Sequence, residues 1–122
     1  MNAYENYLAG NDCLKRSDYL SAIYYFTTSN LLEPHYKTYE KLFLCYYSVN
    51  QIEEAFECIS CAYELNHKND KTALKYAKLL VEYKHDYVLA KKILLNILQR
   101  NPSYKPAKTL LNDISEIFNY KS

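Results

Sequence analysis

The sequence predicts an all-α domain, and three observations support this fold class. Apolar residues recur at the three- and four-residue spacing of amphipathic helices, as in Ile52, Ala55, Phe56 and Ile59. Glycine occurs once and proline three times in 122 residues, which is too few turn-forming residues for an all-β domain. The chain also repeats itself at intervals of 33 and 35 residues, which is typical of a stack of similar helical units.

The internal repeat is centred on Ala22, Ala55 and Ala90, which align at steps of 33 and 35 residues and are expected to be buried where the two helices of a pair meet. The same steps superpose four further columns: Tyr19, Ile52 and Tyr87; Phe26, Ile59 and Leu94; Ser29, Ala62 and Ile97; Pro34, His67 and Pro102. Five columns with matching chemistry and one pair of offsets indicate three copies of one structural unit.

Each repeat is predicted to form two amphipathic helices joined by a short polar turn, so that the two helices run antiparallel. We expect helices over residues 4–16 and 19–32, 37–49 and 52–65, and 71–84 and 87–100. Pro34 and Pro102 follow the second helix of their repeats and end it, because proline cannot continue the hydrogen-bond ladder.

The third repeat requires a choice of register. Strict alignment places Lys78 where the two helices of a pair cross closely, and burying an unpaired ammonium there is costly. One extra residue in the turn places Ala77 at the crossing and Lys78 outside it. We adopt this second register.

The C-terminal segment is predicted to form a helix over residues 104–119. An apolar stripe runs along it: Ala107, Leu110, Leu111, Ile114, Ile117 and Phe118. Because a repeat stack needs a terminal element to cover its last apolar face, we expect a capping helix. The prediction is one domain over residues 1–122, with repeats over 3–35, 36–69 and 70–103.

The stretch from Gly10 to Pro34, GNDCLKRSDYLSAIYYFTTSNLLEP, resembles the tetratricopeptide repeat. The second unit shares six positions with this family (Tyr39, Leu42, Tyr46, Ala55, Ala62 and Leu65) but departs from it at Phe43 and His67. The third unit keeps Asp86, Tyr87, Ala90, Leu94 and Pro102. The resemblance implies a right-handed α-solenoid of helix-turn-helix repeats, whose concave groove binds a peptide or helical segment of a partner protein.

In the family, the first helix of each pair lines the groove. Projected onto one helical face, that surface comprises Tyr4, Tyr7, Asn11, Leu14 and Lys15, then Lys37, Glu40, Lys41, Leu44 and Tyr47, and finally Lys71, Leu74, Lys75 and Lys78. The predicted groove is aromatic toward its N-terminal end and basic toward its C-terminal end. We therefore expect a protein or peptide partner that combines apolar or aromatic residues with acidic ones.

A more specific function of the family is tested by its carboxylate clamp, a set of lysine, asparagine and arginine side chains that hold the C-terminus of a chaperone. Asn11 matches one clamp residue, but Tyr7 stands where a lysine is expected and Lys41 where an asparagine is expected. This incomplete clamp argues against a receptor for chaperone tails. A secretion-type chaperone with three repeats stays open as an alternative.

The formal net charge of +1 hides a strong asymmetry. Residues 1–65 carry 4 basic and 9 acidic side chains, whereas residues 66–122 carry 11 basic and 5 acidic side chains. Such a polarised chain could self-associate end to end as a structural scaffold, which is the main alternative to a peptide-binding adaptor. Nucleic-acid binding is less favoured, because the chain has only two arginines and a net charge near zero.

No pattern in the sequence predicts catalysis, a cofactor or a metal site. One glycine, Gly10, cannot form a phosphate-binding loop. Cys58 and Cys61 form a CxxC pattern, but it lies in mid-helix without a second pair of metal ligands, so both are interpreted as packing residues. His35, His67 and His85 fall in inter-helix turns and suggest no converging triad.

The cellular location is predicted from the N-terminus and the cysteines. Residues 1–12 show neither the basic start nor the apolar core of a signal peptide, and no apolar run is long enough to span a membrane. The four cysteines are then expected to be reduced thiols in a cytoplasmic protein with no membrane partner.

Overall fold

The computed structural model describes residues 1–121 of the chain, and their side chains as far as Asn119. Within this range the chain is helical and contains no strand. It divides into two compact units, Met1–Asn66 and His67–Ser122. The single domain expected over residues 1–122 stays a prediction, whereas the all-α fold class is confirmed.

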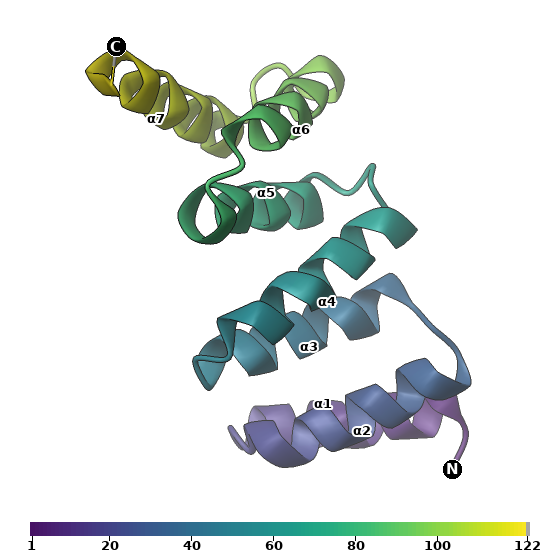
Figure 1. Cartoon of the computed structure of the whole chain (residues 1–122). Helices are drawn as coiled ribbons and strands as arrows, with labels where there is room; N and C mark the ends of the chain where they lie inside the picture. Colours follow the sequence, from purple (N-terminus) through teal and green to yellow (C-terminus); the bar gives the residue numbers. More distant parts are fainter. Residues whose placement is uncertain (122) are drawn as a thin grey trace. The chain divides into compact units, whose positions relative to one another are not determined.

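The first unit, Met1–Asn66, is built from two helix pairs (Figure 1). It contains α1 (Ala3–Lys15), α2 (Tyr19–Leu32), α3 (Tyr36–Ser48) and α4 (Ile52–Leu65). α1 packs against α2, α3 packs against α4, and α2 also packs against α3. The observed bounds differ from those expected by one residue at most.

The second unit contains α5 (Asp70–Leu79), which continues directly into a π-helical turn, η1 (Leu80–Lys84). It then contains α6 (Tyr87–Arg100) and the long final helix α7 (Lys105–Lys121). α6 packs against both α5 and α7, so the apolar stripe of α7 covers the third repeat. Ala107, Leu110 and Ile114 of that stripe are buried, as a capping helix requires.

Helix starts are stabilised by side-chain caps. Asn2 and Glu5 form a capping box on α1: Asn2 Oδ1 accepts from the Glu5 N–H at 2.8 Å, and Glu5 Oε1 accepts from the Asn2 N–H at 2.9 Å. Asp18, Asn69 and Asp86 cap α2, α5 and α6 through their side-chain oxygens. The side chains of these short polar residues accept hydrogen bonds from N–H groups that have no partner within the helix. This explains why the helices begin directly after them.

The turn inside each repeat uses one residue in the left-handed region. Ser17, Asn50 and His85 have φ values of 58°, 62° and 55°. In the first two repeats the following N–H bonds back five residues, from Asp18 to Cys13 and from Gln51 to Tyr46, at 2.9 Å. This left-handed residue closes the first helix and turns the chain into the second.

The third repeat contains one more residue, and η1 accommodates it. The Asp86 N–H bonds to the Leu80 carbonyl, six residues back, at 2.9 Å. Ala77 is fully buried and Lys78 is exposed, which confirms the shifted register. The extra residue lies in the wide last turn of the helix, however, and not in the loop where it was expected.

Close packing between paired helices explains the small residues of the repeat. Ala22, Ala55 and Ala90 are all fully buried, as predicted. Gly10 lies against the Phe26 ring, and a Cβ atom at position 10 would come within 2.7 Å of two ring carbons. Phe26 itself is fully buried at the centre of a cluster that includes Cys13, Leu42 and Cys45.

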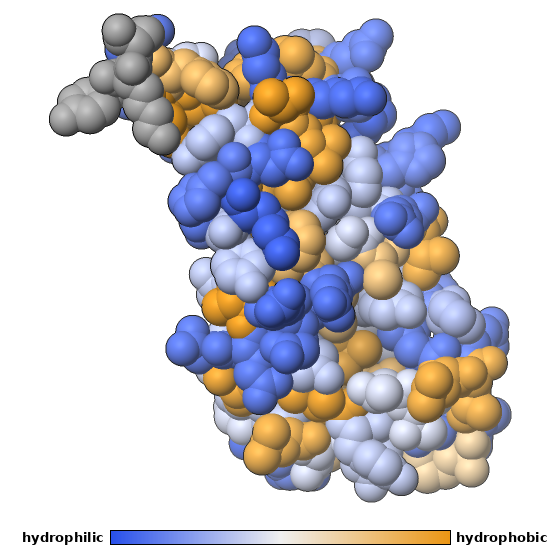
Figure 2. All heavy atoms as spheres, in the orientation of Figure 1, coloured by the Kyte–Doolittle hydropathy of each residue, from blue (hydrophilic) through white to orange (hydrophobic). Residues whose placement is uncertain are grey.

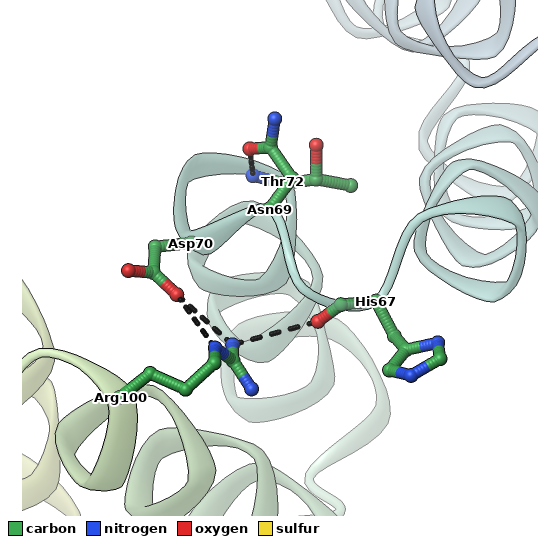
Figure 3. A network of polar contacts seen from close by, with 5 residues as sticks. All are labelled: His67, Asn69, Asp70, Thr72 and Arg100. Carbon is green, nitrogen blue, oxygen red and sulfur yellow. Dashed lines mark hydrogen bonds and ion pairs between the residues drawn. The ribbon is translucent and has the colours of Figure 1, made fainter.

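A polar network joins the ends of α5 and α6 within the second unit (Figure 3). Arg100 donates to Asp70 Oδ1 through Nη2 at 2.9 Å and through Nε at 3.3 Å, and it reaches the His67 carbonyl at 3.5 Å. Asn69 caps the same end of α5 through the Thr72 N–H. Arg100, one of the two arginines, therefore has a structural role. Its partner Asp70 lies in the first turn of α5, where the helix dipole also favours an acidic side chain.

Candidate functional site

A cleft of about 320 Å³ opens in the first unit, where the N-terminal ends of α1 and α3 lie beside the C-terminal end of α2. Eight residues line it: Ala3, Tyr4 and Tyr7 from α1, Ser29 and Glu33 at the end of α2, and His35, Lys37 and Thr38 at the start of α3. Three of them, Tyr4, Tyr7 and Lys37, belong to the groove that the sequence predicts.

Two hydrogen bonds hold the ends of these helices together. The Ser29 hydroxyl donates to the Ala3 carbonyl at 2.7 Å and ties the last turn of α2 to the first turn of α1. Asn30 Oδ1 accepts from the His35 N–H at 3.1 Å and fixes the turn between α2 and α3. Both side chains are buried, and these two bonds fix the backbone around the cleft, although the buried Asn30 Nδ2 has no hydrogen-bond partner among the described residues.

The walls of the cleft combine aromatic rings with charged groups. Tyr7 packs on Phe26 with ring centroids 5.7 Å apart, whereas Tyr4 is 66% exposed. Lys37 and Glu33 bring one charge of each sign to the exposed rim. This arrangement can hold an apolar side chain between rings and bind a charged group beside it.

His35 has a structural role at the edge of the cleft. Its Nδ1 accepts from the Lys37 N–H at 3.1 Å and caps α3. Its ring stacks on Tyr36, with centroids 5.0 Å apart. The imidazole thereby positions the first turn of α3, from which Lys37 and Thr38 line the cleft.

The remaining predicted residues of α1 and α3 differ in exposure. Lys15, Leu44 and Tyr47 are exposed; Asn11, Leu14, Glu40 and Lys41 are half-buried. The Asn11 Oδ1 atom is buried and has no hydrogen-bond partner among the described residues. Asn11 lies on the same face of α1 as Tyr4 and Tyr7, so this face carries two rings and one unsatisfied acceptor.

The predicted residues of α5 form a basic surface on the second unit. Lys71, Lys75 and Lys78 are all exposed. Leu74 is only 9% exposed and packs in the core of its unit, so it offers little surface to a ligand. The helical projection placed Leu74 in the groove together with the three lysines, whereas the structure buries Leu74 and exposes the lysines.

Five residues of the cleft lie outside the predicted set: Ala3, Ser29, Glu33, His35 and Thr38. The predicted groove contains residues of the first helix of each pair only. It therefore excludes the end of α2 and the turn that follows it. Ser29 and Thr38 are each 3% exposed although they line the cleft. The sequence signal for this part of the cleft was the pair of polar residues, Ser29 and Thr38, at positions of adjacent helices where apolar core residues are usual.

The cysteines pack in the first unit, where burial protects their thiols. Cys45 is fully buried, and Cys58 and Cys61 are half-buried. Burial raises the pKa of Cys45 to about 11 and that of Cys58 to about 12, so both stay protonated near neutral pH. No group of three potential metal ligands occurs within residues 1–119.

None of the helices that the structure describes has both the length and the apolar character needed to cross a bilayer.

Comparison with known proteins supports the fold. No protein-family model matches the sequence, and no curated protein sequence matches it. Solved structures do match. The first tetratricopeptide-repeat domain of Spaghetti (RPAP3), bound to the HSP90 peptide SRMEEVD, is 20% identical with a TM-score of 0.79, covering 97% of this chain and 94% of that one.

Two further structures show the same likeness. The second such domain of human RPAP3, in complex with the HSP70 peptide SGPTIEEVD, is 19% identical with a TM-score of 0.74, covering 93% of this chain and 98% of that one. The type III secretion chaperone SycD of Yersinia enterocolitica, in complex with a peptide of the translocator YopD, is 17% identical with a TM-score of 0.70, covering 97% and 92%. The helix pairs, the repeat register and these structures together show that the chain has the tetratricopeptide-repeat fold.

Proposed function

We propose that the chain is a non-enzymatic protein-interaction module that binds a peptide segment of a partner protein in the cleft of its first unit. The observation that carries this proposal is the pair of tyrosines, Tyr4 and Tyr7, beside Lys37 in a cleft of about 320 Å³. A cleft of this size suits one or two side chains of a peptide.

The chemistry of the cleft defines the peptide. The tyrosine rings favour an apolar or aromatic anchor, because they are large and lose few rotamers on binding. Lys37 favours an acidic neighbour beside this anchor. The RPAP3 domains, which share the fold, bind peptides that combine acidic and apolar residues, SGPTIEEVD and SRMEEVD.

Those chaperone tails themselves are not expected to be the preferred ligand. Tyr7 and Lys41 stand at two positions where the clamp uses lysine and asparagine. Because a carboxylate needs several converging donors, an incomplete clamp weakens binding of a free C-terminus. An internal peptide segment with one apolar anchor and adjacent acidic residues fits better.

The test is selection of peptides on the full chain from a random display library, followed by binding kinetics of the enriched peptides. We expect them to combine an apolar anchor with acidic residues, and to bind at least tenfold more tightly than SRMEEVD. Tyr4→Ala should speed dissociation about tenfold, because hot-spot aromatics act mainly on the off-rate.

Leu65→Ala is the control. Leu65 is a large apolar side chain that is 53% exposed, but it lies on α4 outside the cleft. Equal effects of the two substitutions, or enriched peptides without an apolar anchor, would show that the cleft is not the binding site.

A second candidate function is end-to-end self-association as a scaffold. It is favoured by the position of the charge boundary, which coincides with the boundary between the two units at Asn66 and His67. Association of this kind should weaken steeply as salt is raised, since exposed charges are screened.

A further inference from the structure

The second helix of the first unit, α2, exposes apolar side chains without any charge. No residue of Tyr19–Leu32 is charged. Leu20 is 71% exposed, Tyr24 65% and Leu31 81%, and Thr27 is exposed between them. In Figure 2 the surface over α2, along the lower edge of the view, is orange to near white with little blue.

These four residues form one continuous stripe, which we name the α2 stripe: Leu20, Tyr24, Thr27 and Leu31. Their spacings of four, three and four residues place them within about 60° of one another around the helix axis. The opposite face of α2 buries Ala22, Phe26 and Ser29 in the core of the unit. Both sides of the helix are therefore apolar, although only one of them is covered.

The repeat does not require this stripe. In the second repeat, 33 residues later, the positions equivalent to the four stripe residues lie on α4 and are Glu53, Glu57, Ser60 and Glu64. There the same face of the same structural unit is acidic, and its three glutamates are exposed. Since the fold is satisfied by a charged surface at these positions, the apolar side chains of α2 need an explanation other than folding.

We propose that the α2 stripe is the contact surface for a second copy of this chain, with two α2 helices packed antiparallel about a two-fold axis. The stripe is symmetric about its midpoint. Reversal of one helix therefore places Leu20 opposite Leu31 of the other copy, and Tyr24 opposite Thr27. The large ring thus meets a small side chain, so the surface is complementary to itself, as a two-fold interface requires.

The absence of charged side chains on α2 makes this surface compatible with a second copy of itself. In a two-fold contact, a charged side chain near the axis lies close to the same residue of the other copy. Helix α2 has no charged residue, whereas the matching face of α4 would bring glutamates against glutamates. The first unit as a whole carries 9 acidic and 4 basic residues. This excess of acidic residues would repel an anionic membrane surface, and it also opposes the encounter of two first units, a repulsion that salt screens.

The area of the stripe sets the expected strength. Three exposed large side chains offer on the order of 150 Å² each, so two copies together bury about 900 Å². This is below the roughly 1,200 Å² at which standard protein interfaces begin. The dimer is therefore a concentration-dependent one, with a dissociation constant on the order of 10 µM or weaker.

The test is sedimentation velocity of the full chain between about 1 µM and 1 mM, at low and at high salt. We expect a monomer–dimer equilibrium that salt does not weaken, because the contact is apolar. A chain that is monomeric throughout, or whose association is abolished by salt, would refute the α2 contact. The second result would indicate the end-to-end association of oppositely charged units instead.

Charge-pair variants test the register. Leu20→Glu and Leu31→Lys each place a charge against a leucine of the other copy, so each alone should weaken dimerisation at least tenfold. In the double variant Glu faces Lys across the two-fold axis. Dimerisation should then recover to within about threefold of the original chain.

Two substitutions at matching positions of the other repeats serve as controls. Glu64→Gln on α4 changes the net charge as Leu31→Lys does, and Gln99→Glu on α6 changes it as Leu20→Glu does. Neither should alter the equilibrium. Circular dichroism of every variant confirms that the helices are retained. A double variant as weak as the two single ones, or unchanged dimerisation in both single variants, would overturn the antiparallel pairing.

Discussion

At the scale of single residues, Gly10 is a position of the first repeat where close packing leaves no room for a side chain. A Cβ atom there would lie 2.7 Å from Phe26 Cδ1 and Cε1, and this ring is fully buried in the core of the first unit. Gly10→Ala gains about 1 kcal/mol of helix propensity but overpacks the crossing by about 1–3 kcal/mol. We expect a net loss of up to about 2 kcal/mol, measured by urea denaturation.

A double variant checks the cause of this loss. Phe26→Leu removes the atoms that the new methyl group meets, so Gly10→Ala should cost less in the Phe26→Leu background than in the original chain. Additive effects of the two substitutions would show that the contact between position 10 and the ring is not what excludes alanine.

At the scale of elements, the turns within the repeats determine how each pair of helices closes. Ser17 adopts φ 58°, a left-handed conformation that costs a residue with a Cβ roughly 1–2 kcal/mol. Ser17→Gly removes this strain but loses about 0.4–1 kcal/mol through the more flexible unfolded chain. We expect a net gain of about 0.5 kcal/mol in the free energy of unfolding, seen as a higher urea midpoint.

Asn50 is the internal control for this prediction, because it occupies the equivalent position of the second repeat with φ 62°. Asparagine tolerates the left-handed region better than serine does. Asn50→Gly should therefore stabilise the chain less than Ser17→Gly. The reverse order would mean that side-chain contacts, and not backbone strain, govern these turns.

At the scale of the whole molecule, charge is expected to act on the rate of association. Lys71, Lys75 and Lys78 are exposed on α5, and the partner peptide is proposed to contain acidic residues. Replacing all three lysines by glutamate should slow association with such a peptide several-fold and flatten or invert its salt dependence. The dissociation rate should change little.

The matched control for the lysines is a triple substitution of Lys91, Lys92 and Lys108 to glutamate, which changes the net charge by the same amount at exposed positions of α6 and α7. Stopped-flow binding at two salt concentrations separates the two variants. If both slow association equally, net charge alone acts on the encounter and the α5 surface has no special part in it.

Local sequence patterns were sufficient to determine the helices and their pairing. Helical periodicity, the short polar turns and the register of Ala22, Ala55 and Ala90 depend on residues close in the chain, so the seven helices and the buried alanines followed from the sequence. Excluding a buried ammonium at Lys78 also required only a local argument. The π-helical turn that absorbs the extra residue did not follow, because turn and helix end can both accommodate one residue.

The cleft was decided by the tertiary structure. Ser29 and Thr38 belong to different helices, and the cleft exists because the Ser29 bond to Ala3 and the Asn30 bond to His35 bring three helix ends together. Contacts between distant parts of the chain leave no periodic signal in either segment. For the same reason the sequence placed Ala22 of α2 in the core but did not show that the opposite face is uncovered: burial depends on the neighbouring helices, and they cover Phe26 while leaving Leu20 and Leu31 exposed.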